Sequence, residues 1–180
     1  MFIEDDNFIS DQGKYFLKLI LSGDYPFPFK YMPDSVSKDT NSFLSHSFIE
    51  RVPTVEHEPV SVGGFTKLFT DIAEEFLKKH NLEVKKYCRG SVNLTFNNGA
   101  DKCPTHYDHH YDHHQLIIYA NEPKDKDSKL VILDDDKKTI LRKIEPTQYK
   151  GVLFDRKPHF HYYPKFGDRI AIIYTFILKK

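Results

Sequence analysis

The pattern of hydrophobic and polar positions changes its period near residue 83. Before that point, two stretches carry apolar residues at helical spacing. The first begins at Ser10 or Asp11 and ends at Ser22-Gly23, and the second runs from Phe65 to His80. We therefore predict two N-terminal helices, preceded by a short edge strand from Phe2 to Phe8.

From residue 84 onward, short apolar segments alternate with turns rich in Asp, Lys, Pro and Gly. Short strands at this spacing after two helices predict an α+β, mainly β fold, an antiparallel sandwich or jelly roll backed by helices. The charged run from Lys124 to Lys129 is typical of a solvated hairpin. The expected strands are Val84–Phe96, Gln115–Tyr119, Leu130–Leu133, Thr139–Ile144, Gly151–Asp155 and Arg169–Leu178.

Residues 24–62 have no clear period, because five prolines interrupt them while aromatic residues recur. Such a region is either a functional lid or binding loop, or an irregular cover over one end of the core. A chain of 180 residues is long enough for one domain with a sizeable core. We expect a single domain over 1–180, with 1–82 as helical support and lid and 83–180 as the β-core.

Composition excludes several classes of function. Basic and acidic residues number 26 each, so the net charge favours neither nucleic acid nor anionic lipid as a partner. The N-terminus has no basic segment and no long apolar run, so we expect no signal peptide and no membrane span. Two cysteines, Cys88 and Cys103, do not form a disulfide framework and favour a cytoplasmic protein.

The ten histidines are clustered, which directs attention to a metal. Five fall within 106–114, and two more are His159 and His161. Side chains at i and i+2 of an extended segment point the same way, so an H-x-D pair can supply two ligands to one ion. A histidine about fifty residues later can complete the 2-His-1-carboxylate triad of non-haem Fe(II) oxygenases.

Two H-x-D pairs compete for this role, His106-Tyr107-Asp108 and His110-Tyr111-Asp112. The first is favoured because it leaves a longer run before the strand that ends at Tyr119. His159 and His161 compete for the third position, and periodicity does not separate them. The competing interpretation is a histidine-rich surface loop that binds stray Zn or Ni without function.

Arg169 opens an almost wholly apolar C-terminal strand. An unpaired buried charge is costly, so this arginine either points into a cavity or forms a core salt bridge. Its planar guanidinium suits an acidic cosubstrate of a metal site.

Taken in order, these motifs resemble the prolyl-4-hydroxylase-like group of 2-oxoglutarate- and Fe(II)-dependent dioxygenases. The resemblance is strong over 84–180 and extends to small stand-alone oxygenases of phages and large-genome viruses, which would place the protein in a host cytoplasm. The matching segments are Asp6-Asn7-Phe8-Ile9-Ser10, His106-Tyr107-Asp108, Leu116-Ile117-Ile118-Tyr119-Ala120-Asn121, Ile144-Glu145-Pro146, Gly151-Val152-Leu153-Phe154-Asp155, Pro158-His159, Pro164 and Gly167-Asp168-Arg169-Ile170-Ala171-Ile172.

The resemblance implies a double-stranded β-helix with Fe(II) held by His106, Asp108 and His159. The Pro158-His159 match favours His159 over His161. Fe(II), 2-oxoglutarate and O2 are the implied cofactors and cosubstrates, with ascorbate as a further candidate. The residues implied to bind 2-oxoglutarate are Arg169, which would hold its distal carboxylate, Tyr119, which would donate a hydroxyl, and Asn93 and Phe96, which would line its pocket.

The implied reaction is hydroxylation of an unactivated C–H, first of a peptidyl proline or another protein side chain. A nucleobase or a small metabolite is the alternative substrate. Two rival functions are a non-catalytic, cupin-like metal-binding module and an interaction domain that kept the fold without activity. Arg169 with Tyr119 discriminates, because a metal site without turnover needs no carboxylate fork.

Overall fold

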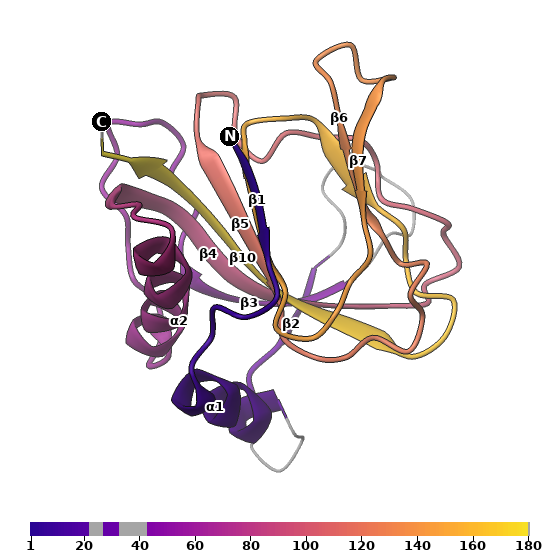
Figure 1. Ribbon diagram of the computed structural model, residues 1–180, viewed down its shortest axis with the longest axis horizontal. Coiled ribbons are helices and arrows are strands. Elements are labelled where there is room, and N and C mark those ends of the chain that lie inside the picture. The colour runs from indigo at the N-terminus through magenta and orange to yellow at the C-terminus, as the bar shows by residue number, and fades with distance from the viewer. Residues whose placement is uncertain (22–26, 33–42, 180) are drawn as a thin grey trace.

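The computed structural model describes residues 1–21, 27–32 and 43–179, which form two antiparallel sheets and two helices (Figure 1). The helices are α1 (Asp11–Leu21) and α2 (Thr66–Lys79). The smaller sheet has the order β7 (Ile140–Ile144), β6 (Leu130–Leu133), β9 (His159–His161). The seven-stranded sheet has the order β1 (Phe2–Asp5), β8 (Gly151–Asp155), β5 (His114–Tyr119), β10 (Asp168–Leu178), β4 (Val84–Phe96), β3 (Phe43–Ile49), β2 (Lys30–Met32).

The central strand β10 separates the two faces of the large sheet. Its even-numbered residues from Ile170 to Phe176 join the core that packs under α2, which covers the outer face of the sheet (Figure 1). The Tyr174 hydroxyl ties this face to the helix by donating to the Phe69 carbonyl at 2.6 Å. Ala171, on the other face, packs with Leu130 and Ile132 of the small sheet. Strand alternation therefore gives β10 one face toward the helix and one toward the space between the sheets.

Most of the predicted elements are confirmed. The second helix forms between Phe65 and His80, and Asn81 ends it in the left-handed region at φ 54°. Strands β4, β6 and β8 have the predicted bounds, and β5, β7 and β10 differ by one residue at their first position. The first helix begins at Asp11, whereas its expected end at Ser22-Gly23 lies outside the described residues. The N-terminal strand is shorter than predicted and ends at Asp5.

Residues 24–62, expected to form either a lid or binding loop or an irregular cover, contain two strands that the sequence did not predict. Strand β3 lies within this region and pairs along β4, from Leu44 opposite Leu94 to Ile49 opposite Gly90. Strand β2 extends the sheet beyond β3. The pattern was hidden because Ser45 and Ser47 are polar although they face a cavity. Residues 33–42 of this region lie outside the described part of the chain.

The prediction of a solvated hairpin at Lys124–Lys129 is also wrong. The strands on either side of it, β5 and β6, belong to different sheets, so the segment crosses between them. Asp125 and Ser128 are buried, and the Asp125 carboxylate accepts hydrogen bonds from the backbone of Asp127 and Lys165. One of the charged residues that suggested a solvated turn, Asp125, is therefore a buried hydrogen-bond acceptor for backbone N–H groups.

Among the described residues, neither helix has the length and apolar character that a membrane crossing requires.

Candidate metal centre

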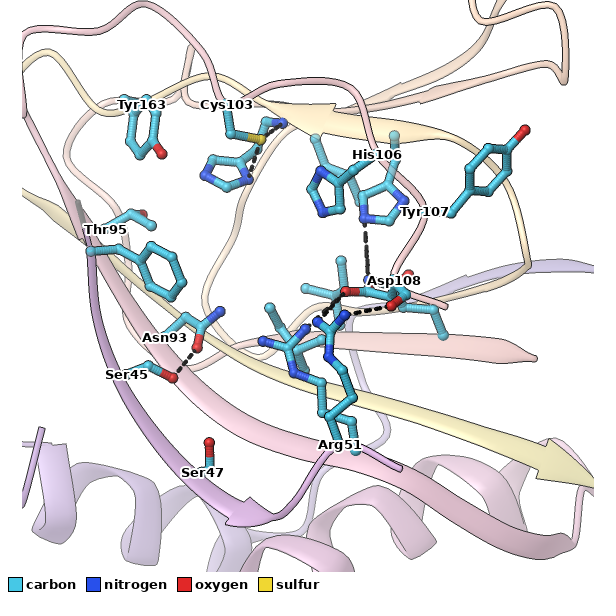
Figure 2. Close-up of a pocket in the computed structure, with 18 residues that line it drawn as sticks. Ser45, Ser47, Arg51, Asn93, Thr95, Cys103, His106, Tyr107, Asp108 and Tyr163 are labelled. Atoms are coloured by element: carbon cyan, nitrogen blue, oxygen red, sulfur yellow. Dashed lines mark hydrogen bonds and ion pairs between the residues drawn. The ribbon is translucent and has the colours of Figure 1, made fainter. Parts of the chain in front are cut away.

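A cavity of about 450 Å³ lies between the two sheets (Figure 2). Strands β3, β4, β5 and β10 of the large sheet form one wall, and β6 and β9 of the small sheet form part of the other. Its lining combines apolar and polar side chains, as in many small-molecule sites. The lining residues are Phe43, Ser45, Ser47, Arg51, Arg89, Asn93, Thr95, Cys103, His106, Tyr107, Asp108, Gln115, Ile117, Leu130, His159, His161, Tyr163 and Ile173.

The favoured H-x-D pair and a distal histidine meet at one end of this cavity. His106 and Asp108 lie on the connection between β4 and β5, and His159 opens β9. The backbones of His106 and His159 exchange two hydrogen bonds of 3.0 Å, and their ring centroids lie 4.6 Å apart. Segments about fifty residues apart in sequence are thus fixed side by side by the backbone.

Hydrogen bonds orient both imidazoles in the same way. His106 Nδ1 lies 2.8 Å from the Pro104 carbonyl, and His159 Nδ1 lies 3.0 Å from the Lys157 carbonyl. A carbonyl accepts only from a protonated nitrogen, so each ring carries its proton on Nδ1 and presents the lone pair of Nε2. This arrangement is typical of metal-binding histidines. Burial, followed by the charge of His106, lowers the pKa of His159 to about 4, which keeps it neutral at pH 7.

Asp108 is buried between these histidines and two arginines. Its Oδ2 lies 3.8 Å from His159 Nε2, whereas its Oδ1 accepts from Arg89 Nη1 at 2.8 Å and from Arg51 Nη2 at 3.4 Å (Figure 2). Burial by itself raises the pKa of this carboxyl, but the Arg89 guanidinium above all, with the neighbouring imidazoles of His159 and His106 and then Arg51, holds it well below its usual range. Asp108 is therefore ionised, with one oxygen turned toward the histidines.

The three side chains are close, but they do not already form a complete coordination set. Within the described ranges, no group of three or more His, Cys, Asp or Glu side chains is placed to hold a metal ion. Metal binding here requires side-chain adjustment at His106, Asp108 and His159.

The predicted carboxylate-binding arginine lies behind the lining at the far end of the cavity. Arg169 is 4% exposed and lies opposite Thr95 in the pairing of β10 with β4. Its Nη1 donates to the Ser128 carbonyl at 2.5 Å and to the Tyr162 carbonyl at 3.3 Å. No carboxylate pairs with it in the described part of the chain, and its Nε is buried without a hydrogen-bond partner there. The core salt bridge that the sequence left open is therefore not seen among the described residues.

Tyr119 and His161 surround this arginine. Tyr119 is 1% exposed, interacts electrostatically with Arg169, and has its pKa raised to about 12 by burial. His161 lines the cavity with its Nδ1 3.3 Å from Cys103 Sγ, and its buried Nε2 has no partner within the described residues. Arg169 and Tyr119 lie behind the cavity lining rather than in it.

The remaining predicted residues divide into two groups. Asn93 lines the cavity and accepts a hydrogen bond of 2.7 Å from the Ser45 hydroxyl. Phe96 does not reach the cavity, because alternation along β4 gives that place to Thr95. The competing pair His110 and Asp112 is exposed and outside the cavity lining.

Sequence reasoning missed several polar residues of the cavity, above all Arg51, Arg89 and Gln115. Arg89 had a detectable signal, since it begins a polar alternation in β4 that continues through Ser91 to Thr95. Arg51 had none, because it lies in the segment whose period is broken by prolines.

No protein-family model and no curated protein matches the chain. Solved structures do resemble it over nearly its whole length. An oxidoreductase of the 2OG-Fe(II) oxygenase family from Burkholderia pseudomallei gives a TM-score of 0.72 at 10% identity, covering 97% of this chain and 84% of that one. The chain has the 2OG-Fe(II) oxygenase fold.

Two further structures with this oxygenase fold are prolyl hydroxylases. The enzyme from Trichoplax adhaerens, in complex with a hypoxia inducible factor peptide, gives a TM-score of 0.67 at 15% identity, covering 98% of this chain and 83% of that chain. The viral collagen prolyl hydroxylase of Paramecium Bursaria Chlorella virus-1, in complex with 2OG, gives 0.54 at 16% identity, covering 97% and 93%. The shared oxygenase fold therefore includes the N-terminal third, where the sequence motifs are weak.

Proposed function

We propose that the chain is a 2-oxoglutarate- and Fe(II)-dependent dioxygenase that hydroxylates an unactivated C–H bond. The observation that carries the proposal is the pairing of two features at opposite ends of one cavity. His106, Asp108 and His159 converge at one end, and Arg169 lies buried behind the lining of the other, with no partner for its Nε in the described part of the chain. A metal-binding module without turnover has no use for the second feature.

The residues at the metal end fit Fe(II). Two neutral imidazoles and one carboxylate are the donor set of non-haem Fe(II) oxygenases. Bound iron supplies the activation of O2 and the oxidation of the target carbon, with 2-oxoglutarate as the electron donor that becomes succinate and CO2. The protein presents His106 Nε2 and His159 Nε2 unprotonated, and it keeps Asp108 ionised through Arg89.

The residues at the far end fit a carboxylate. The Arg169 guanidinium is anchored through Nη1 and offers its Nε, which has no hydrogen-bond partner among the described residues. The raised pKa of Tyr119 keeps its hydroxyl protonated, so it can donate to the same group. His161, whose Nε2 also lacks a partner in the described chain, gives this end a third polar atom. We assign the distal carboxylate of 2-oxoglutarate to this end.

We also propose the finer features that the resemblance implies. The two facing sheets are the halves of a double-stranded β-helix, and 1–180 is one catalytic domain. A peptidyl prolyl or other protein side chain is the first substrate, because the similar structures include prolyl hydroxylases, one of them in complex with a peptide. A cytoplasmic location stays a prediction from the cysteine content.

An anaerobic titration separates this function from its rival, the non-catalytic metal module. Fe(II) is added to the full chain with and without 2-oxoglutarate, and the metal-to-ligand charge-transfer absorption is measured. The band should appear only when both are present, because it reports a 2-oxo acid chelating the iron. Fe(II) binding without the band would contradict the oxygenase and leave a cupin-like module.

A further inference from the structure

Two arginines converge on the cavity beside Asp108, and neither belongs to the metal set or to the carboxylate-binding end. Arg51 Nη1 donates to the Asp108 backbone carbonyl at 2.6 Å, and its Nη2 lies 3.4 Å from Asp108 Oδ1. Arg89 reaches the same oxygen from β4 at 2.8 Å. Figure 2 shows the Arg51 side chain extending to Asp108 across the lower part of the cavity.

The positive charge of these two guanidiniums exceeds the negative charge of the side chains around them. Asp108 is the one acidic side chain among the described residues that line the cavity, and it has a single carboxylate for both arginines. A divalent metal bound to the same carboxylate would add further positive charge. The dianion 2-oxoglutarate is matched by the metal and Arg169, so it leaves the charge of Arg51 and Arg89 largely uncompensated. Excess positive charge in a cavity with low-dielectric walls attracts an anion.

The arginines also retain donors. A guanidinium has five N–H groups, and within the described chain Arg51 uses two of them and Arg89 one. The Arg51 side chain is half-exposed, with 50% of its surface accessible, whereas that of Arg89 is 15% exposed. Arg51 thus stands at the open rim, where an incoming molecule can reach it, and Arg89 lies deeper, next to the metal end.

We infer that Arg51 and Arg89 form a binding site for an anionic group, a carboxylate or a phosphate, carried by the substrate next to the carbon that is oxidised. The inference rests on the proposed function, because it assigns the substrate class of the same cavity. The two guanidiniums hold the anionic group on the side of the cavity opposite Arg169, where Ser47 of β3 also lines the cavity. Guanidinium groups suit such anions because they can form paired, charge-assisted hydrogen bonds.

The test is direct binding of two probes, inorganic phosphate and N-acetyl-aspartate amide, to the full chain loaded with Mn(II) and 2-oxoglutarate under anaerobic conditions. Affinity is measured by calorimetry. Arg51→Gln should weaken the better probe about tenfold or more, since a charge-assisted hydrogen bond is lost. Arg51→Lys should keep part of the affinity. The matched control is Arg142→Gln, because Arg142 lies on β7 against Phe2, outside the cavity lining.

The outcomes separate the possibilities. Tighter phosphate binding assigns a phosphorylated substrate, and tighter binding of the aspartate amide assigns an acidic side chain. Failure of both probes to bind, or equal affinity in wild type and Arg51→Gln, would overturn the anion site. Binding of 2-oxoglutarate is measured first on the Mn(II) protein, so failure of the cosubstrate assignment shows itself in that step. If 2-oxoglutarate does not bind, the probes are titrated into the Mn(II) protein without it. The affinities of wild type and Arg51→Gln for the probes then test the anion site in the same way.

Discussion

At the scale of single residues, the two competing H-x-D pairs differ in how deeply the structure buries them. Asp108 is 5% exposed and faces His159, whereas His110 and Asp112 are exposed. Spacing favoured the first pair only through the run before Tyr119, because both pairs place their side chains on one side of an extended segment. Burial could not be deduced from sequence, since it depends on Arg51 and Arg89 from two other parts of the chain.

His106→Ala and Asp108→Ala should each abolish iron-dependent succinate formation, because each removes a proposed ligand. The matched controls His110→Ala and Asp112→Ala should keep most of it, since both side chains lie outside the cavity lining. Succinate release and Fe(II) affinity are measured on all four variants. Loss in the second pair with retention in the first would reverse the ligand assignment.

His159→Ala should eliminate tight Fe(II) binding, whereas His161→Ala should weaken it only mildly. We expect this difference because His159 lies beside His106, with which it exchanges backbone hydrogen bonds, whereas His161 lies against Cys103. His161→Ala should act more on 2-oxoglutarate, whose carboxylate-binding end it borders. The equilibrium affinities for Fe(II) and for 2-oxoglutarate are measured on both variants. An indispensable His161 beside a dispensable His159 would show that the two histidines have exchanged roles.

Arg169→Lys should lower the affinity for 2-oxoglutarate by roughly tenfold to a hundredfold, because the planar fork loses one charge-assisted hydrogen bond worth about 1.5–3 kcal/mol. Fe(II) affinity without 2-oxoglutarate should barely change. Tyr119→Phe should have the same effect on a smaller scale. The two affinities are measured separately, and unchanged 2-oxoglutarate binding in Arg169→Lys would assign this arginine to structure alone.

At the scale of elements, prediction succeeded for continuous apolar strands and failed for the very short strands β2 and β9 and for β3, which turns polar side chains into the cavity. Strands β6 and β8 are continuous apolar runs, so their bounds follow from the sequence. Strand β3 exposes serines to the cavity on one face and buries Phe48 on the other, within a region broken by prolines. Strand β9 has only three residues, too few for a period.

Gly90→Ala should destabilise the protein by about 1–3 kcal/mol, the usual cost of overfilling a packed core. A Cβ at Gly90 of β4 would overlap the Phe48 ring, which is fully buried and stacked on Phe69 at 4.8 Å. Urea unfolding measures the change. Gly64→Ala is the control, because a Cβ there meets nothing within 4 Å. Equal stability of the two variants would mean that Phe48 can move aside.

At the scale of the whole molecule, a mostly buried carboxylate, Asp5, joins the N-terminal strand to the C-terminal end of α2 through Lys79 and His80. Burial alone raises the pKa of the Asp5 carboxyl, but hydrogen bonds from Lys79, the Asn7 backbone and His80 hold it below its usual value. A carboxyl with a lowered folded pKa stabilises the protein above its unfolded pKa of about 3.9, and the contribution is lost as pH falls through the folded value.

Asp5→Asn should therefore lower the free energy of unfolding at pH 7, and the difference from wild type should shrink as the pH falls below about 4. Urea unfolding at pH 7, 5 and 3 measures it. Asp11→Asn is the control, since its Lys14 contact is solvent-exposed and 3.6 Å long. A difference that is constant with pH would show that Asp5 acts through packing rather than charge.

The pairing of β1 with β8 has a consequence for how the chain is made. Ile3 pairs with Leu153, so β1 is synthesised about 150 residues before its partner strand. Contacts this distant in sequence close late and slow folding. Until β8 (Gly151–Asp155) is synthesised, β1 has no partner strand, and its edge can pair with other chains. Chaperone occupancy during translation should therefore fall once Gly151–Asp155 has emerged.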